Sequence, residues 1–261
     1  MFCFTMALRS KAVSNDWKKI SSLCEASIRS AYHQINPEIK IILVCHETPE
    51  LEESYDNRVE IINVDFPRPN EILAESKHDD ETKYHIQMED KWRKIAVGVV
   101  RAGELNPNFM MLMDADDLVS RRLSEYAASH PTANGWIFKK GYRYSYGSRW
   151  IYVDDNYNCG TNAIVNSKLI DFPKSTAPEE IKKCVILTSG HTIIEKTLAE
   201  LGTPLTPLPF LGGVQVVNYG NNASNLVGVG GRPTIRQILG RLRRTRWLSP
   251  KLRREFSIPS D

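Results

Sequence analysis

The stretch Phe109-Met110-Met111-Leu112-Met113, followed at once by Asp114-Ala115-Asp116-Asp117, decides the fold. Five consecutive apolar residues without alternation are typical of a strand buried on both faces, as in a parallel sheet covered by helices. Open α/β sheets bind their ligands at the carboxyl ends of such strands. Aspartates crowded at that end repel one another, and a bound cation is the simplest compensation. The segment therefore predicts an α/β fold with a cation-dependent site.

The segments before this strand alternate between helical and extended patterns. Apolar residues recur at steps of three and four over residues 16–33 and 92–100, which predicts two amphipathic helices. Short β-branched runs at 39–45 and 59–64 predict strands, and a short apolar strand precedes the first helix. The polar stretch 68–88 has little periodicity and predicts a long surface loop. This order of elements is typical of an α/β domain.

The second half of the chain predicts shorter elements. Residues 120–128 predict a helix, and the aromatic-rich stretch 136–153 predicts a β-hairpin or meander. Another helix is expected to begin after Ser189-Gly190-His191 and to end before Gly202. Residues 214–217 predict a last strand.

Charge is distributed unevenly in an otherwise ordinary globular composition. The 261 residues are 41% apolar and 25% charged, with a net charge of +3. Residues 232–261 contain nine Lys or Arg against two Asp or Glu, so they carry +7 and the rest of the chain −4. We therefore divide the chain into a body, 1–231, which contains the expected cation-dependent site, and a basic C-terminal extension, 232–261. The extension is expected to contact an anionic partner such as a membrane surface, with a solvated end as the alternative.

Several function classes are disfavoured. The five cysteines are widely spaced without a C-x-x-C pair, so neither a disulfide framework nor a zinc site is indicated. No apolar run reaches the ~18 residues of a membrane-spanning helix, and no signal peptide is recognised. A cytoplasmic location, at most peripheral to the inner face of a membrane, is expected. P-loop, G-x-S-x-G and H-E-x-x-H motifs are absent, and no nucleic-acid partner is expected, because the basic extension contains few aromatic residues.

The acidic segment has the chemistry of a metal site. Asp114 and Asp116, two residues apart, can both serve one Mg²⁺ or Mn²⁺ ion, directly or through water, with phosphate oxygens at other positions. Asp117 is expected to orient a ligand or to bind a sugar hydroxyl. Such a site binds a nucleotide diphosphate through the metal.

These residues resemble the GT-A-fold glycosyltransferases of the family 2-like, DxD-containing kind, which use nucleotide-sugar donors. The resemblance rests on FMMLM-DADD at 109–117, on the helix DKWRKIAVGVVRAGE at 90–104, and on the opening ALRS…W…SIRSAYHQ…KIILVCHE. It covers about residues 4–118 and implies a GT-A-like, Rossmann-type mixed sheet flanked by helices. It also implies that Asp114 and Asp116 hold the metal that bridges the donor diphosphate.

The same resemblance implies roles for other residues. Lys91 is expected to be a cation near the donor, and Ala7, Leu8 and Arg9, which end the first strand, to line the nucleoside site. His191 is expected to add a metal ligand, or else to form a local hydrogen bond at the start of its helix.

Two further segments bear on the donor. Many family members end the second strand with an acidic residue that reads the base or ribose, whereas this chain has Cys45-His46-Glu47 there and Asp65 after the next strand. Asp65 is therefore the donor-binding candidate. The Gly/Asn-rich residues 219–224 predict either a mobile loop over the donor phosphates or an ordinary turn.

Transfer to an acceptor hydroxyl requires a group that removes its proton. In inverting enzymes a carboxylate does this as general base. The candidates are the carboxylates that follow the metal motif in two loops: Asp154, Asp155, Glu179 and Glu180. No E-D pair of the sort carried by many inverting members is present, so both stereochemical outcomes stay open.

The sequence thus predicts a metal-dependent glycosyltransferase that moves a sugar from a UDP- or GDP-sugar to an unidentified hydroxyl acceptor, whether a glycan, a lipid or a small molecule. One alternative is a sugar-1-phosphate nucleotidyltransferase-like enzyme, although ALRSKAVSND, after the first strand, lacks a glycine-rich phosphate loop. The other is a non-catalytic protein that binds nucleic acid or membranes through the Arg-rich extension.

Overall fold

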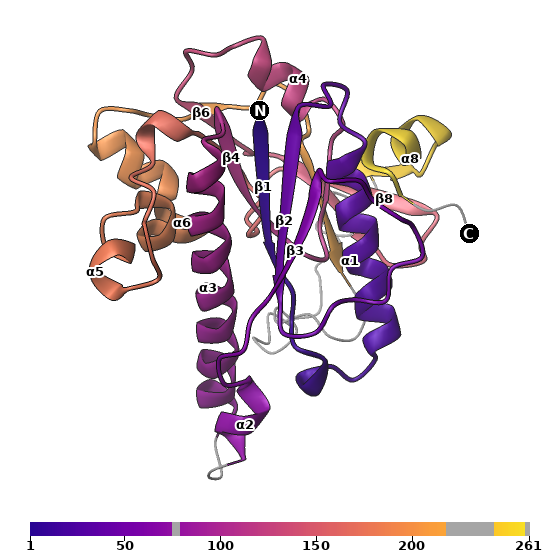
Figure 1. Ribbon diagram of the computed structural model, residues 1–261. Coiled ribbons are helices and arrows are strands. Elements are labelled where there is room, and N and C mark those ends of the chain that lie inside the picture. The colour runs from indigo at the N-terminus through magenta and orange to yellow at the C-terminus, as the bar shows by residue number, and fades with distance from the viewer. Residues whose placement is uncertain (75–78, 218–242, 259–261) are drawn as a thin grey trace.

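A seven-stranded mixed sheet forms the centre of the molecule (Figure 1). The computed structural model describes residues 1–74, 79–217 and 243–258. The strand order is β10 (Thr206–Pro207), β6 (Gly135–Ile137), β9 (Ala163–Asn166), β4 (Phe109–Asp114), β1 (Phe2–Ala7), β2 (Ile39–Cys45) and β3 (Val59–Asn63). The strands β4, β1, β2 and β3 are parallel to one another, and β9 is antiparallel to both β4 and β6. The predicted α/β fold is confirmed.

A second sheet of five strands packs near the first. Its order is β12 (Thr245–Trp247), β8 (Trp150–Asp154), β7 (Gly141–Ser145), β11 (Gly213–Val217) and β5 (Leu118–Val119). β7 and β8 are antiparallel, which confirms the predicted hairpin. β11 pairs with β7 in parallel and with β5 in antiparallel, so residues 213–217 lie next to the segment that follows β4.

The register of the parallel strands brings their carboxyl ends to one edge. Phe2 of β1 aligns with Ile39 of β2 on one side and with Phe109 of β4 on the other. At the other end, Ala7 of β1 therefore lies beside Asp114 of β4. The apolar run before Asp114 is an interior strand, as predicted, and every residue of it except Leu112 is buried.

Helices cover both faces of the central sheet. The side chains of Phe4 and Met6 face a core shared with α1 (Trp17–Tyr32) and the smaller sheet. Cys3, on the other face, belongs to a core shared with α3 (Asp80–Leu105) and α6 (Val185–Glu200). This alternation follows from the two-residue period of a strand. The other described elements are the short α-helices α2 (Pro69–Leu73), α4 (Leu123–Ala128), α5 (Pro178–Ile181) and α8 (Pro250–Phe256) and two 3-10 helices, Lys11–Val13 and Ser167–Leu169.

Helix boundaries follow local capping. The side chain of Asp16 accepts a hydrogen bond from the backbone N–H of Lys19 (2.9 Å) and starts α1. Asp79 accepts one from the N–H of Thr82 (2.8 Å) and starts α3. Asn106, with φ of +48°, ends α3 in the left-handed conformation.

The prediction of a loop over residues 68–88 is wrong in its second half. α3 begins at Asp80, and α2 lies within the first half. Between Asp80 and Glu89 no side chain of α3 is buried, because this part of the helix extends past the carboxyl ends of the strands (Figure 1). A helix segment whose side chains are at most half-buried shows little apolar periodicity, so the pattern was not detected in the sequence.

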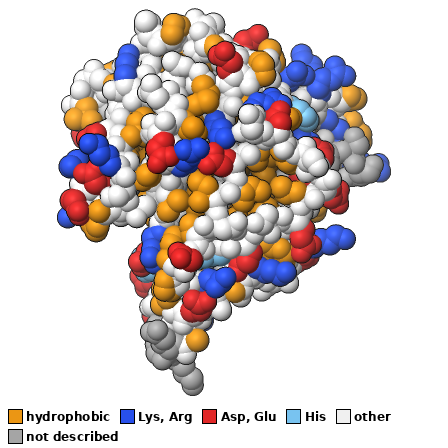
Figure 2. Space-filling view, in the orientation of Figure 1, with side chains coloured by type: hydrophobic (Ala, Val, Ile, Leu, Met, Phe, Trp, Pro, Cys, Tyr) orange, Lys and Arg blue, Asp and Glu red, His pale blue; other side chains and the backbone are white. Residues whose placement is uncertain are grey.

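The described part of the basic C-terminal segment packs into the body. Leu248, Phe256 and Ile258 are each at most 4% exposed and belong to the same core as β1 and α1. Lys and Arg side chains gather over this region, at the upper right of Figure 2. The boundary expected between residues 231 and 232 and the loop 219–224 lie outside the described residues. No helix in the described part of the chain is long and apolar enough to cross a membrane.

Replacing Phe256 tests whether α8 belongs to the folding unit. Its ring is 1% exposed and makes an edge contact with Tyr142, with ring centroids 5.5 Å apart. We expect Phe256→Ala to lower the free energy of unfolding by about 3–5 kcal/mol, because it leaves a cavity in the core. The measurement is urea unfolding, with Lys251→Ala, an exposed position on the same helix, as the control within about 0.5 kcal/mol of wild type. A Phe256→Ala protein as stable as the control would contradict this packing.

Candidate active site

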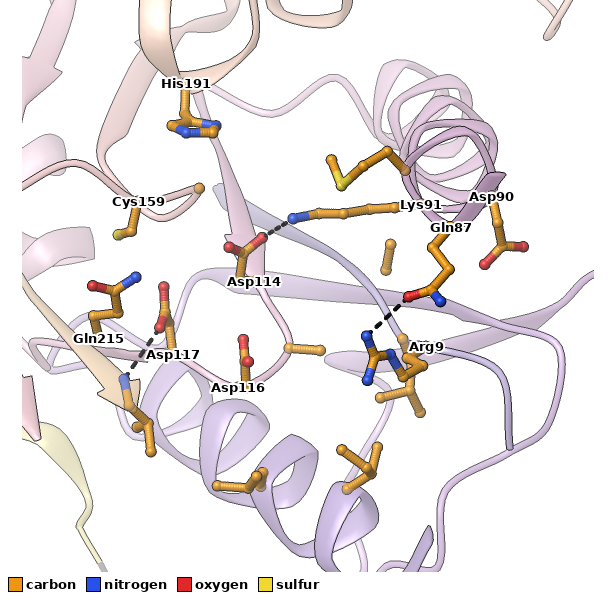
Figure 3. Close-up of a pocket in the computed structure, with 18 of the residues that line it drawn as sticks. Arg9, Gln87, Asp90, Lys91, Asp114, Asp116, Asp117, Cys159, His191 and Gln215 are labelled. Atoms are coloured by element: carbon orange, nitrogen blue, oxygen red, sulfur yellow. Dashed lines mark hydrogen bonds and ion pairs between the residues drawn. The ribbon is translucent and has the colours of Figure 1, made fainter. Parts of the chain in front are cut away.

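A cavity of about 360 Å³ lies at the carboxyl ends of β1 and β4. Its walls come from the end of β1, from α1, from α3, from the turn after β4, from the loop before β9, from α6 and from β11. Figure 3 shows polar side chains from these elements around it: Arg9, Gln87, Asp90, Lys91, Asp114, Asp116, Asp117, His191 and Gln215. The site is therefore assembled from segments distributed over more than two hundred residues of the chain.

Most of the residues predicted for the donor and the metal line this one cavity. They are Ala7, Leu8, Arg9, Lys91, Asp114, Asp116, Asp117 and His191. Their placement follows from the sheet register and from the position of α3 against β1. The individual roles assigned to them stay predictions.

The central contact of the cavity is an ion pair between Lys91 and Asp114. Lys91 Nζ, from α3, lies 2.5 Å from Asp114 Oδ1, at the end of β4 (Figure 3). Burial disfavours both charges, but each partner outweighs it, so the pKa of Asp114 is lowered and that of Lys91 is raised. The backbone of Gly160 also donates to Asp114, and a Cβ at position 160 would overlap that carboxylate. A glycine is therefore required where this loop meets the acidic segment.

Asp117 is the buried member of the acidic segment. Its side chain is 2% exposed; the N–H of Val216 donates to Oδ1 (3.4 Å), and Oδ2 has no hydrogen-bond partner among the described residues. Burial and the charges of Asp116 and Asp114 raise the pKa of Asp117 well above its ordinary value, and hydrogen bonds with Thr161 and Cys159 offset this only in part. The acidic segment therefore carries an electrostatic cost on the side away from Lys91.

The side chains present fit a divalent ion that also takes oxygens from a substrate. Within the described ranges, no three His, Cys, Asp or Glu side chains are grouped so as to hold a metal by themselves. Asp114 and Asp116 supply hard carboxylate oxygens, and the unpartnered Oδ2 of Asp117 lies beside them. Mg²⁺ is typically held by one or two carboxylates together with substrate phosphates and water, so this set is sufficient for that mode of binding.

His191 faces the acidic segment from α6. Gly190 interrupts α6 with φ of +57°, so His191 begins its second helical part. α6 itself begins at Val185, six residues earlier than predicted. Burial lowers the pKa of His191, and the nearby Asp114 offsets this only in part. The imidazole is therefore neutral at pH 7, the form that can ligate a metal or accept a proton.

A buried network supports the end of β1. His46 Nε2 lies 2.8 Å from Asp90 Oδ1, and Lys94 Nζ lies 2.6 Å from Asp90 Oδ2. Lys94 also donates to the carbonyl of Leu8 (3.0 Å), which fixes the backbone next to Arg9. Glu47, which follows β2, is turned toward Ser10, Lys11 and Arg68 and does not line the cavity. The carboxylate that lines the cavity on this side is that of Asp90 in α3.

The opposite end of the cavity combines apolar walls with a polar pair. Arg9 Nη2 donates to Gln87 Oε1 (3.1 Å). Apolar and aromatic side chains line the surrounding wall: Val13, Ile20, Leu23, Tyr84 and Met88. Apolar walls with a few placed polar groups are typical of sites for small organic ligands, including flat rings.

Five predicted residues do not line the cavity: Asp65, Asp154, Asp155, Glu179 and Glu180. Asp65 is exposed after β3. Asp154 pairs with Arg143 (2.7 Å) and Asp155 with Lys140 (3.1 Å) at the far end of the β7–β8 hairpin. Glu179 and Glu180 lie in the first turn of α5, where Glu180 pairs with Lys183 (2.7 Å). In the described structure Asp154, Asp155 and Glu180 are thus paired with basic side chains away from the cavity.

Other residues of the cavity were not predicted. Gln87 and Asp90 precede Lys91 by four residues and one residue, and Tyr84 lies one further turn back. The spacing of Tyr84, Gln87 and Lys91 would have placed these three along one side of a helix, but the polar stretch 68–88 was read as a loop. Asp90 lies at the start of the segment that was read as a helix, but no role was assigned to it. Gln215 and Gly160 reach the site only through the pairing of β11 and the course of the loop before β9, and no local signal marks them.

Comparison with known proteins gives similarity at the level of solved structures. No family model matches the chain, and no curated protein matches it. The chain is similar to S. aureus TarS 1–349 in complex with UDP, with 10% sequence identity, a TM-score of 0.47, and coverage of 83% of this chain and 60% of that chain. Against a longer TarS structure it spans 36% of that chain.

Two further solved structures are similar over most of this chain. One is Francisella tularensis 2-C-methyl-D-erythritol 4-phosphate cytidylyltransferase, with 11% identity, a TM-score of 0.37, and coverage of 87% of this chain and 97% of that chain. The other is Mycobacterium tuberculosis glucosyl-3-phosphoglycerate synthase in complex with Mn²⁺, UDP and phosphoglyceric acid, with 11% identity, a TM-score of 0.34, and coverage of 92% and 78%. At these identities the similarity concerns the backbone, and the chemistry available to the site follows from its own residues.

Proposed function

We propose that this chain is a glycosyltransferase that moves a sugar from a nucleotide-sugar donor, bound with Mn²⁺ or Mg²⁺, to a hydroxyl acceptor. The observation that carries the proposal is the Lys91–Asp114 ion pair inside an enclosed group of aspartates at the carboxyl edge of a parallel sheet. That arrangement provides both positive charge and oxygen ligands at one point, as the diphosphate of a nucleotide-sugar requires.

Several residues of the cavity would contact the diphosphate or the metal ion bound to it. A divalent ion held by Asp114 and Asp116 would stabilise the negative charge that grows on the diphosphate as the anomeric C–O bond breaks. Lys91 would then contact the diphosphate oxygens, because it is 32% exposed toward the cavity and extends from a rigid helix. His191, neutral at pH 7, is the candidate for a further ligand or hydrogen-bond partner on the opposite wall.

The nucleoside is assigned to the end formed by Arg9, Gln87 and Asp90. Apolar side chains of α1 and α3 would contact the faces of the base, and the three polar groups would contact its edges or the ribose. The network through Lys94 and His46 keeps Asp90 and the backbone of Leu8 in place. UDP- and GDP-sugars are the donors we expect.

The turn after β1 argues against the alternative function, that of a nucleotidyltransferase. Such an enzyme needs free backbone N–H groups there for a triphosphate. In this chain the N–H of Lys11 donates to Glu47 Oε2 (2.9 Å), and that of Ala12 donates to Ser10 Oγ (3.3 Å). These donors are already satisfied by the protein's own side chains.

Calorimetric titration with UDP, GDP and CDP, each with and without Mn²⁺, tests the donor site. We expect one nucleotide to bind in a metal-dependent way, and Asp114→Asn and Asp116→Asn each to weaken that binding at least about 10-fold, or 1.4 kcal/mol. Asp171→Asn, an exposed carboxylate outside the cavity, is the matched control and keeps wild-type affinity. Binding that is equally strong in all variants and indifferent to Mn²⁺ would contradict the proposal.

Product analysis separates the two enzymatic alternatives. A glycosyltransferase releases UDP or GDP from its nucleotide-sugar, and in the absence of an acceptor it does so slowly by transfer to water. A nucleotidyltransferase instead releases pyrophosphate from a nucleoside triphosphate and a sugar 1-phosphate. Pyrophosphate release that is lost in Asp114→Asn would replace the proposed activity with the alternative.

Asp117→Asn tests the electrostatic cost in the acidic segment. The raised pKa means that the folded state holds the Asp117 proton more tightly than the unfolded chain. The ionised form therefore destabilises the fold, by an amount that grows as the pH rises above the ordinary Asp value of about 4. At pH 7 in EDTA we expect Asp117→Asn to raise the Tm, by roughly 2–4 °C for each kcal/mol relieved. The measurement is calorimetric unfolding with Asp171→Asn as control, and a lower Tm for Asp117→Asn would contradict the expectation.

A further inference from the structure

A second cavity, of about 600 Å³, lies at the other edge of the central sheet. It is formed where α1 ends, before β2 and β3 begin, and by the C-terminal segment around α8. The candidate active site lies at the carboxyl ends of the same strands, so the two cavities are separated by the length of the sheet. Four arginines line the second cavity: Arg29, Arg58, Arg121 and Arg254.

Two of these arginines are neutralised and held in place. Arg29 Nε lies 2.8 Å from Glu53, and Arg58 Nη2 lies 2.9 Å from Asp56. The Arg58 guanidinium also stacks over the ring of Tyr32, at 3.9 Å from its centroid. Arg58 is therefore fixed before any ligand arrives.

The other two arginines lack a carboxylate partner. Within the described ranges, neither Arg121 nor Arg254 forms an ion pair through its side chain, and Arg121 Nε is buried without a hydrogen-bond acceptor. Buried donors are nearly always paired in folded proteins. With Arg29 and Arg58 balanced by their partners, the cavity has an excess of two positive charges before His33 is counted.

We propose that this cavity binds a small anion that carries two or more phosphate groups. Guanidinium groups match phosphate oxygens in charge and in their forked donor geometry. Four of them around one concavity recognise a compact, multiply charged ligand, and the volume is in the range of small-molecule sites. The phosphates belong either to a free polyphosphate-type anion or to the headgroup of a phospholipid. The inference is independent of the function proposed for the other cavity.

Such binding would connect the C-terminal segment to the amino edge of the sheet. Arg254 comes from α8, Arg121 follows β5, and Arg58 precedes β3. A phosphate-bearing ligand that bridges them would hold α8 against the body. It would also account for part of the positive charge that the sequence concentrates at this end, in the region where Lys and Arg side chains gather in Figure 2.

Titration of the full chain with inorganic pyrophosphate and tripolyphosphate, in EDTA, tests the proposal. EDTA removes divalent ions and so prevents metal-dependent binding in the first cavity. We expect binding that weakens at least tenfold in Arg254→Gln and in Arg121→Gln and that falls as salt is raised. Lys251→Gln is the matched control, because it removes the same charge from the same helix outside the cavity, and it keeps wild-type affinity. Chemical shifts of the arginine Nε–H groups report that each variant is folded and which arginines respond.

A second arm distinguishes the two sources of phosphate. The same proteins are sedimented with vesicles of phosphatidylglycerol and phosphatidylcholine. Vesicle binding without pyrophosphate binding, lost in Arg254→Gln and kept in Lys251→Gln, assigns the site to a lipid headgroup. Absence of both kinds of binding, or equal binding by Arg254→Gln and Lys251→Gln, would overturn the proposal.

Discussion

The parallel register of β2, β1 and β4 is the constraint on which the rest of the structure depends. Because Phe2 is aligned with both Ile39 and Phe109, the three strands end together, and Asp114 emerges beside Ala7. α3 packs across β1 and β2 and carries Lys91 to that same edge. A slip of one residue in β4 would turn Asp114 to the other face of the sheet and break this convergence.

The charges at that edge are balanced on one side only. Lys91 compensates Asp114, while Asp117 stays buried with an unpartnered oxygen and a raised pKa. A buried carboxylate of this kind lowers the stability of the fold, and such groups occur most often at functional sites. The buried ion pair of Asp90 with Lys94 lies at the same edge of the sheet. Lys94 also donates a hydrogen bond to the carbonyl of Leu8, which connects α3 to the residue that follows β1.

The two cavities use charge in opposite ways. The first cavity is lined by aspartates, one of which is paired with Lys91, and this arrangement suits a cation together with a diphosphate. The second cavity is lined by four arginines, two of which are paired with Glu53 and Asp56, and this arrangement suits phosphate groups without a metal. The C-terminal segment that the sequence separates by its charge is, where described, part of the core through Leu248 and Phe256. Basic composition therefore does not by itself indicate a separate tail, because arginines can cover a helix whose other face is buried.

The sequence by itself determined the strands at 39–45 and 109–114, the helix from Trp17 and the position of Asp114, Asp116 and Lys91, because periodicity and apolar runs report burial directly. It missed the exposed start of α3, where no side chain is fully buried, and with it Gln87. Only the tertiary structure decided that Gln215, Gly160 and His191 share a cavity with β1, and that Asp154 and Glu180 are paired elsewhere. Gln215 and Gly160 reach the cavity from segments far apart in the chain, and sheet pairing rather than local pattern brings such segments together. Glu180, by contrast, pairs with Lys183 only three residues away.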